Sequence, residues 1–302
     1  MPFDERYIAQ VRLLLQVLPL LAEHEVFALK GGTAINLFDR ALPRLSVDID
    51  LAYLPINERT VALADVTKRL GVIGKQAKER LKLTRVSEHM NEGAVTRLVL
   101  IGNSAQIKVE VSPVLRGSIE PPRKVDVHEE VESMFGFAQA QLVSKADLYA
   151  GKFCAALDRQ HPRDLFDVAE LIENEGLDVV PIEAFLVYLI SHNRPFHELI
   201  APNRKELEPA FSNEFRGMAR NEVAIDRLIS ARESLVDWVM NRMTTQHRTF
   251  LLSVAKGEPD WSALSVTNAA ELPAVKWRVQ NIRGMVLARR NETAAHLEKI
   301  FT

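Results

Sequence analysis

The chain has 302 residues, 47% of them hydrophobic and 26% charged, with a formal net charge of −2. This length can bury one large core or two smaller ones, and the charge excludes a protein that is basic throughout while allowing a local basic patch. The single cysteine excludes an internal disulfide framework and indicates a reducing compartment. The N-terminus has no signal-peptide pattern, and the apolar run 11–22 is too short to span a bilayer. We expect a soluble cytoplasmic protein, with a monomer as the default.

Helical and strand-like patterns alternate along the first part of the chain. Amphipathic periodicity predicts long helices over 4–22 and 57–80, and the Gly31-Gly32 turn opens a shorter helix over 33–40. Strands are predicted from alternating β-branched residues over 26–29, 45–54, 81–89, 96–102 and 105–112. A Gly-Asn pair at 102–103 is a favoured hairpin turn between the last two strands.

The character of the sequence changes after the Pro-Pro pair at 121–122, and from about residue 140 onward the pattern is helical. We therefore predict an α+β protein. A mixed N-terminal sheet with flanking helices, residues 1–125, is followed by a mainly helical C-terminal domain, residues 126–302. The cysteine and the tryptophans are expected to be packing residues of the helical domain: Cys154, Trp238, Trp261 and Trp277.

Two carboxylates stand two residues apart in the strand predicted over 45–54. Because side chains alternate along a strand, its apolar residues face one side, while Asp48 and Asp50 share the other side with Ser46. Two like charges this close raise each other's pKa unless a cation lies between them, and Mg²⁺ prefers carboxylate oxygens. One interpretation is a metal site, and the other is a half-exposed strand with two solvated acids.

The strand predicted over 105–112 brings a third acid. Glu110 shares a face with Lys108, opposite the apolar residues of that strand. If the two strands are neighbours, Glu110 meets Asp48 and Asp50 over one site, as a site with two metal ions requires. An ordinary Lys–Glu pair on a solvated sheet face explains the same two residues.

The glycine pair offers a place for a phosphate group. Gly31 and Gly32 let the backbone approach a ligand closely, and a helix N-terminus presents free N–H groups. Thr33 adds a hydroxyl and Lys30 a positive charge at the same end. Ser46 is placed either to hydrogen-bond a phosphate or to tie down its own loop. A Gly-Gly-Thr sequence is also commonplace in turns.

A row of cations is predicted on the helix that follows residue 144. Lys145, Lys152 and Arg159 are spaced by seven residues and therefore share a face. Such a row can hold a triphosphate, with Lys152 as the candidate for direct phosphate contact.

Pro162 ends that helix and begins the next one. Asp164 and Asp167 lie three residues apart on one face of the second helix, beside Arg163. These residues are candidates for nucleotide contact. A structural explanation is also open, in which Asp164 complements the helix dipole and the arginine is ion-paired with Asp167 or Glu170.

The stretch 68–85 contains seven Lys or Arg against one Glu. Such a stretch can neutralise the phosphates of a nucleic acid, and a solvated helix face explains it nearly as well.

The order of these elements resembles the nucleotidyltransferase (polymerase β-like) superfamily, whose signature is hydrophobic-Gly-[Gly/Ser], a spacer, and Asp-x-[Asp/Glu]. "LKGG" and "SVDIDL" fit this signature, with fifteen residues between Gly32 and Asp48, slightly more than is usual there. A closer resemblance is to the AbiEii/AbiGii toxin family, which includes the MenT toxins. Its first two motifs look like "LKGGTAINLF…RLSVDIDL" and "IKVE".

The third motif of that family is similar to "DLYAGKFCAALDRQHPRDLFDVAEL". His161 stands where a second basic residue is common in the family. The distal "LPAVKWRVQNIRGM" resembles the family's Leu-Pro-…-Trp-…-Asn segment, so the resemblance spans about 25–290. The third motif matches in register at Asp147, Lys152, Ala155, Arg159, Arg163, Asp164 and Asp167.

The resemblance implies a nucleotidyltransferase-type sheet and two-metal transfer of a nucleotide from an NTP to RNA, in particular to the 3′ acceptor end of tRNA. It implies a toxin of a toxin–antitoxin pair, with an antitoxin encoded nearby as partner. Asp48, Asp50 and Glu110 would hold Mg²⁺ or Mn²⁺. The catalytic residues it implies are Asp48, Asp50, Glu110, Lys152 and Asp167. The nucleotide-binding residues would be Lys30, Gly31, Gly32, Thr33, Ser46, Lys108, Arg163 and Asp164.

Two other functions remain open at this point. One is the same chemistry on a small-molecule acceptor, as in antibiotic-modifying nucleotidyltransferases. The other is a non-catalytic module that binds a nucleotide or a protein partner, against which the three intact carboxylates argue.

Overall fold

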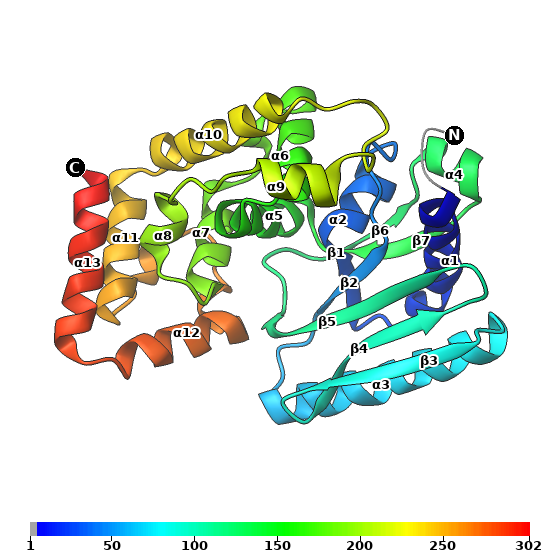
Figure 1. Cartoon of the computed structure of the whole chain (residues 1–302). Helices are drawn as coiled ribbons and strands as arrows, with labels where there is room; N and C mark the ends of the chain where they lie inside the picture. Colours follow the sequence, from blue (N-terminus) through cyan, green and yellow to red (C-terminus); the bar gives the residue numbers. More distant parts are fainter. Residues whose placement is uncertain (1–4) are drawn as a thin grey trace. The chain divides into compact units, whose positions relative to one another are not determined.

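The computed structural model describes residues 5–302, apart from the side chain of Arg6 (Figure 1). The described residues form two compact units. The first contains the residues up to Ser144 together with the short segment Arg216–Val223, and the second contains Lys145–Phe215 and Ala224–Thr302.

The first unit is built on one seven-stranded sheet in the order β3-β4-β5-β2-β1-β7-β6. Two pairs, β1–β7 and β2–β5, are parallel, and the other pairs are antiparallel. The predicted α+β class with a mixed sheet is therefore confirmed. The strands are β1 (Phe27–Lys30), β2 (Asp48–Tyr53), β3 (Arg85–Asn91), β4 (Ala94–Ile101), β5 (Gln106–Arg116), β6 (Arg123–Asp126) and β7 (Gln139–Leu142).

The alternation of side chains along the central strands gives the sheet one apolar and one polar face. On β2, Ile49 is fully buried, whereas Asp48 and Asp50 are half-buried on the opposite side. The apolar face of β4 is covered by α3 (Arg59–Arg80), which lies along that strand in Figure 1. Gly74 lets α3 approach closely, because a Cβ there would lie 3.2 Å from a methyl of Val86.

The long helices were predicted from the sequence. Residues 4–22 and 57–80 correspond to α1 (Glu5–Ala22) and α3, and the predicted start at residue 4 lies outside the described residues. The shorter helix begins at the glycines themselves, as α2 (Gly31–Ala34) followed by a π-helical turn over Ile35–Asp39. A fourth helix, α4 (Glu129–Phe135), lies between β6 and β7.

The last two strands of the sheet were not predicted, and the helical pattern expected from about residue 140 is wrong for β7. The two are antiparallel neighbours, and β7 adds to the sheet beside β1. Each has only four residues. On β7 the alternation is present, since Ala140 and Leu142 are buried between more accessible glutamines. A signal over four residues is too short to separate from a helix start.

The second unit is helical. None of the helices in the described part of the chain is long and apolar enough to cross a membrane. The α-helices of this unit are α5 (Lys145–Arg159), α6 (Pro162–Asn174), α7 (Ile182–Ser191), α8 (Phe196–Ile200), α9 (Glu208–Ala210), α10 (Ile225–Arg242), α11 (Thr245–Lys256), α12 (Pro273–Arg283) and α13 (Leu287–Phe301). Its short turns are 3-10 helices at Leu177–Val179, Trp261–Ala263 and Ala269–Glu271 and a π-helix at Phe211–Phe215.

Packing of this unit confirms most of the predicted core. Cys154 is buried, and burial raises the pKa of its thiol. Trp238 packs edge-on against Phe153, with ring centroids 5.3 Å apart. Trp277 is the exception, because 46% of its surface is exposed.

The short segment 216–223 returns to the first unit and fixes the loop that precedes β2. Leu45 donates its N–H to the carbonyl of Met218 at 2.9 Å, and Arg220 donates its N–H to the carbonyl of Pro43 at 2.8 Å. The guanidinium of Arg220 also reaches the carbonyl of Ala41 at 2.6 Å. The spacer between the glycine pair and β2 is therefore an ordered loop, held by residues far away in sequence.

Candidate active site

Four charged residues form one lateral row across the polar face of the sheet. Lys30 on β1 pairs in register with Asp50 on β2, and Asp50 pairs with Glu110 on β5. Glu110 in turn pairs with Arg97 on β4. Because residues in register on neighbouring strands point to the same face, the predicted meeting of Asp50 and Glu110 follows from the strand order. Asp48 lies on the same face, two residues before Asp50. We call the three carboxylates of this face, Asp48, Asp50 and Glu110, the acidic row.

Asp48 is held at the start of β2 by the hydroxyl of Thr33. Thr33 is 1% exposed, and its Oγ1 donates to the backbone carbonyl of Asp48 at 2.5 Å. The same hydroxyl lies 3.0 Å from Oγ of Ser46. Thr33 was predicted near a phosphate group, and Ser46 was predicted either as a phosphate ligand or as a tie for its own loop. In this structure they join α2 to the strand that carries the acids, which makes them positioning groups for Asp48.

Side chains pack against both glycines, and Gly31 also has a backbone conformation that favours glycine. Gly31 has φ +73°, and a Cβ there would lie 2.8 Å from Oδ2 of Asp50. At Gly32 a Cβ would lie 2.6 Å from Nη2 of Arg44 and 2.9 Å from Oγ of Ser46. Arg44 itself is 3% exposed and donates to the carbonyl of Leu45 at 2.8 Å. The glycine pair thus lets the Asp50 carboxylate and a buried guanidinium pack directly on the backbone.

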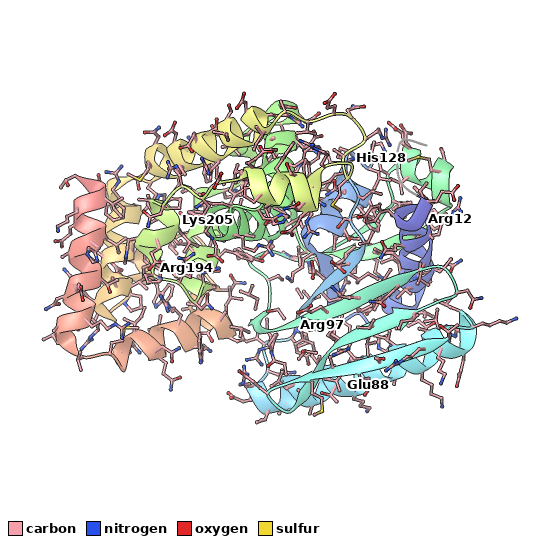
Figure 2. The ribbon with its side chains drawn as sticks, viewed as in Figure 1. Arg12, Glu88, Arg97, His128, Arg194 and Lys205 are labelled. Atoms are coloured by element: carbon pink, nitrogen blue, oxygen red, sulfur yellow. The ribbon has the colours of Figure 1, made fainter. Side chains whose placement is uncertain are left out.

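Arg97 is a site residue that sequence analysis missed. Its Nε and Nη2 donate to the two carboxylate oxygens of Glu110 at 2.9 and 3.1 Å, on the open side of the sheet (Figure 2). The hydrogen bonds that Arg97 donates to Glu110 raise the pKa of Arg97, and the charge of Asp48 adds to the shift. Only the register between β4 and β5 reveals this pair, since the two residues are thirteen positions apart in sequence.

The donors of the acidic row fit a hard divalent cation. All are carboxylates, two on one strand face and the third in register on the parallel neighbour, and Mg²⁺ prefers such oxygens. Among residues 5–302, no three acidic, histidine or cysteine side chains are gathered closely enough to hold an ion. In this structure the carboxylate of Glu110 is paired with the guanidinium of Arg97. Asp48 and Asp50 would hold the ion, and Glu110 would join them by leaving Arg97.

The second unit carries a buried ionic cluster. Nζ of Lys152 lies 3.0 Å from Oδ1 of Asp164 and 2.8 Å from Oδ2 of Asp167. The three side chains are 6%, 5% and 0% exposed. Arg159, whose side chain is exposed, also forms an ion pair with Asp164, with a nitrogen–oxygen distance of 2.8 Å. We call Lys152, Asp164 and Asp167 the buried triad. Its carboxylates pair with Lys152 and Arg159 of their own unit, whereas the structural explanation had considered arginine pairs with Asp167 or Glu170.

Three predicted nucleotide-binding residues have cationic groups that pair with no described residue: Lys30, Lys108 and Arg163. Lys30 and Lys108 lie on the polar face of the sheet, in register with Asp50 and Asp48. Arg163 is half-buried in the second unit, next to the buried triad in sequence. The ammonium groups of Lys30 and Lys108, on one sheet face, are suited to the negative charge of a triphosphate.

The basic stretch lies on α3 and the strand after it. Arg69 and Arg80 are neutralised, by Asp65 at 2.9 Å and by Glu23 at 2.5 Å. The other basic residues of the stretch are exposed: Lys68, Lys75, Lys78, Lys82 and Arg85.

Comparison with known proteins shows the family and the fold of the chain. A family model described as "Nucleotidyl transferase AbiEii toxin, Type IV TA system" matches residues 12–280. Among solved structures, MenT4, a nucleotidyltransferase toxin from Mycobacterium tuberculosis H37Rv, is similar with a TM-score of 0.55 at 13% sequence identity. The alignment covers 98% of this chain and 92% of that one. At this identity the likeness shows the fold alone. No curated protein matches the sequence.

Proposed function

The chain belongs to the AbiEii family of nucleotidyltransferase toxins, and from this premise we propose that it transfers a nucleoside monophosphate from an NTP to RNA. The acceptor in this proposal is the 3′ end of tRNA. As a member of this family the chain is an NTP-using nucleotidyltransferase of a type IV toxin–antitoxin system. The observation that carries the proposal is the acidic row, in register across two parallel strands and beside the glycine pair.

Asp48 and Asp50 hold the divalent ion in this proposal, Mg²⁺ or Mn²⁺. When bound, the ion polarises the α-phosphate and neutralises the charge that develops there. Lys30 and Lys108, the unpaired cations of the same sheet face, attract the triphosphate. A fixed cation near a phosphate is worth more on a partly water-excluded face than in bulk water.

Glu110 receives the proton of the attacking hydroxyl on a carboxylate oxygen. The oxygen of that hydroxyl bonds to the α-phosphorus as the bond to the bridging oxygen breaks, and pyrophosphate leaves. In this structure the Glu110 carboxylate is paired with Arg97, and it would leave this guanidinium to join Asp48 and Asp50 before the transfer. The proposal also keeps four residues of the second unit as residues that the transfer requires: Lys152, Arg163, Asp164 and Asp167.

The proposal includes further features that rest on the family. The cognate antitoxin is encoded nearby, the protein acts in the cytoplasm, and the chain works as a monomer. A small-molecule acceptor is the competing function, and the experiment below separates the two.

The test is incubation of the purified protein with total tRNA, Mg²⁺ and each α-³²P-labelled NTP in turn, with Asp48→Ala as control. We expect label in a band of tRNA size, with release of pyrophosphate, and neither with the variant. Absence of label in RNA, with pyrophosphate release on addition of small hydroxylated acceptors, would move the function to a small-molecule substrate.

A further inference from the structure

The tryptophans of the second unit fall into two classes. The indole N–H of Trp238 donates to Asp178 at 2.8 Å, and Trp261 packs on Phe250 with ring centroids 5.6 Å apart. Trp277, on α12, is 46% exposed, and no described residue stacks on its ring or accepts its N–H. A large aromatic side chain left half in water on an ordered helix stabilises the fold little. The structure therefore leaves about half of this residue open to a partner.

The surroundings of Trp277 are cationic. Residues 273–290, which span α12 and the start of α13, contain five Lys or Arg and no Asp or Glu. Only Lys276 among them has a carboxylate partner, Glu271 at 2.6 Å. The guanidinium groups of Arg278 and Arg283 bind backbone carbonyls instead, at 2.9 Å in each case. Carbonyls fix these groups without cancelling their charge, so the corner between α12 and α13 keeps a net positive charge (orange to red in Figure 1).

Amide side chains complete the surface. Gln280 is exposed and Asn281 half-exposed, three and four residues after Trp277, so they lie beside the indole on the same helix face. Trp277 thus offers an aromatic plane beside two amides, on a helix whose other faces carry guanidinium groups hydrogen-bonded to carbonyls, and this combination suits an unpaired nucleotide. The base stacks on the ring, the amides reach its edge, and the cations attract the phosphates. A protein-binding patch would not require such an excess of one charge.

We propose that the α12–α13 corner binds a single-stranded segment of the RNA acceptor, with one unpaired base stacked on Trp277. The inference rests on the proposed function for the identity of the RNA, but the binding surface itself lies entirely within the second unit. It also gives the "LPAVKW" segment, which sequence analysis could only match to a family pattern, a physical role.

The first measurement is the affinity of the full-length protein for a fluorescein-labelled single-stranded RNA and for deacylated tRNA, by fluorescence anisotropy. Trp277→Ala should weaken binding by about tenfold, since stacking on one aromatic ring contributes on the order of 1–3 kcal/mol per base. Trp277→Phe, which keeps an aromatic plane, should recover most of the loss. Val286→Ala is the matched control, because Val286 is 71% exposed at the same corner and has no π face. Unchanged affinity in Trp277→Ala, or an equal loss in Val286→Ala, would overturn the proposal.

A second measurement uses the indole as its own probe. RNA should quench the intrinsic fluorescence of the wild type and protect it from acrylamide, and Trp277→Phe should abolish both effects. Circular dichroism of each variant checks that the fold is intact. If Trp277→Ala changes only the oligomeric state and not RNA binding, the surface is a protein contact and the inference is wrong.

The two proposals fail separately. Label transfer to tRNA that is equally efficient in wild type and Trp277→Ala, with unchanged KM for tRNA, overturns the inference and leaves the function standing. RNA binding that depends on Trp277, without label transfer to any RNA, overturns the acceptor proposal and leaves the surface standing.

Discussion

The acidic row and the buried triad use the same residue types in opposite ways. In the first unit Asp48 and Asp50 are half-buried on a sheet face whose other side is fully apolar. In the second unit Asp164 and Asp167 are almost inaccessible and pair with a lysine of their own unit. Carboxylates that a fold leaves partly in water remain available to a ligand. Carboxylates buried with a cation contribute mainly to the geometry of the protein, because separating them leaves a charge in a medium of low dielectric constant.

The largest expected difference between the two regions is that a substitution in the buried triad lowers stability, whereas one in the acidic row lowers activity. Asp167→Asn should lower the free energy of unfolding by about 3–5 kcal/mol, because Lys152 loses a buried counterion. Asp50→Asn should leave it within about 1 kcal/mol of the wild type, since the group is half-solvated, while nucleotide transfer falls by on the order of a hundred- to a thousandfold. Urea denaturation and label transfer measure the two effects. Equal losses of stability in both variants would contradict the proposed difference between the buried triad and the acidic row.

A substitution in the glycine pair tests whether activity depends on the exact position of Asp50. Gly31→Ala places a Cβ 2.8 Å from Oδ2 of Asp50 at a φ of +73°. Gly93→Ala is a matched control, since Gly93 has φ +82° and nothing within 4 Å of the added Cβ. Both should lose about 1–2 kcal/mol of stability through the left-handed conformation. Only Gly31→Ala should also lose transfer activity, by about tenfold or more, because Asp50 must move. Similar activities in the two variants would mean that Asp50 tolerates the displacement.

A smaller effect is expected where the acidic row meets Arg97. The Arg97–Glu110 pair is 43% and 44% exposed, so Arg97→Gln should change stability by less than about 1 kcal/mol. Mn²⁺ affinity, measured from the electron paramagnetic resonance signal of the free ion, should rise by about threefold as a competing charge is removed. Arg59→Gln, which breaks another exposed pair of the same unit, is the control. Weaker Mn²⁺ binding in Arg97→Gln would show that the arginine holds Glu110 in the ligand position.

The smallest effect concerns pH, and it compares histidines of the two units. His24, in the first unit, is 9% exposed, and neither ring nitrogen hydrogen-bonds to a described residue. Burial lowers the pKa of His24 from its ordinary 6.5, and the charge of Arg69 lowers it further, against the opposing charges of Glu23 and Asp65. Burial also lowers the pKa values of His192 and His197 in the second unit.

A depressed pKa means that the unfolded chain takes up a proton before the folded one does. The stability from His24 is therefore complete above pH 6.5 and is lost as the pH falls from 6.5 toward the folded pKa. His24→Leu should reduce the loss of stability between pH 7.5 and 5.5, in urea denaturation at both values. An unchanged loss would assign the acid sensitivity to the two histidines of the second unit.

The sequence predicted the features that depend on local pattern. Alternation placed Asp48 and Asp50 on one face of a strand, and Pro162 marked the break between two helices, as α5 and α6 confirm. Contacts that depend on the register between two strands could not be predicted from the sequence, above all the pair of Arg97 with Glu110. The roles of Thr33 and Ser46 were open for the same reason, since their hydrogen bonds depend on how α2 lies against β2.

Trp277 was misjudged because a tryptophan in an amphipathic pattern is normally a core residue. Its exposure depends on the direction in which α12 presents that face, which composition does not encode. For the same reason the sequence did not predict the ion pairs of Lys152 with Asp164 and Asp167. A lysine on a helix face looks the same in sequence whether that face meets a ligand or two aspartates.

Residues 216–223 belong to the first unit, so during synthesis the loop before β2 is made before the segment that holds it. The loop before β2 is held by the carbonyl of Met218 and by Arg220. The ribosome adds about 5–20 residues per second, and during synthesis the N-terminal parts of a chain can fold first. The strand that carries the acidic row is therefore translated long before its supporting segment exists. We expect the nascent chain to be harmless until the segment 216–223 has emerged, so a messenger truncated before that point would yield no active toxin.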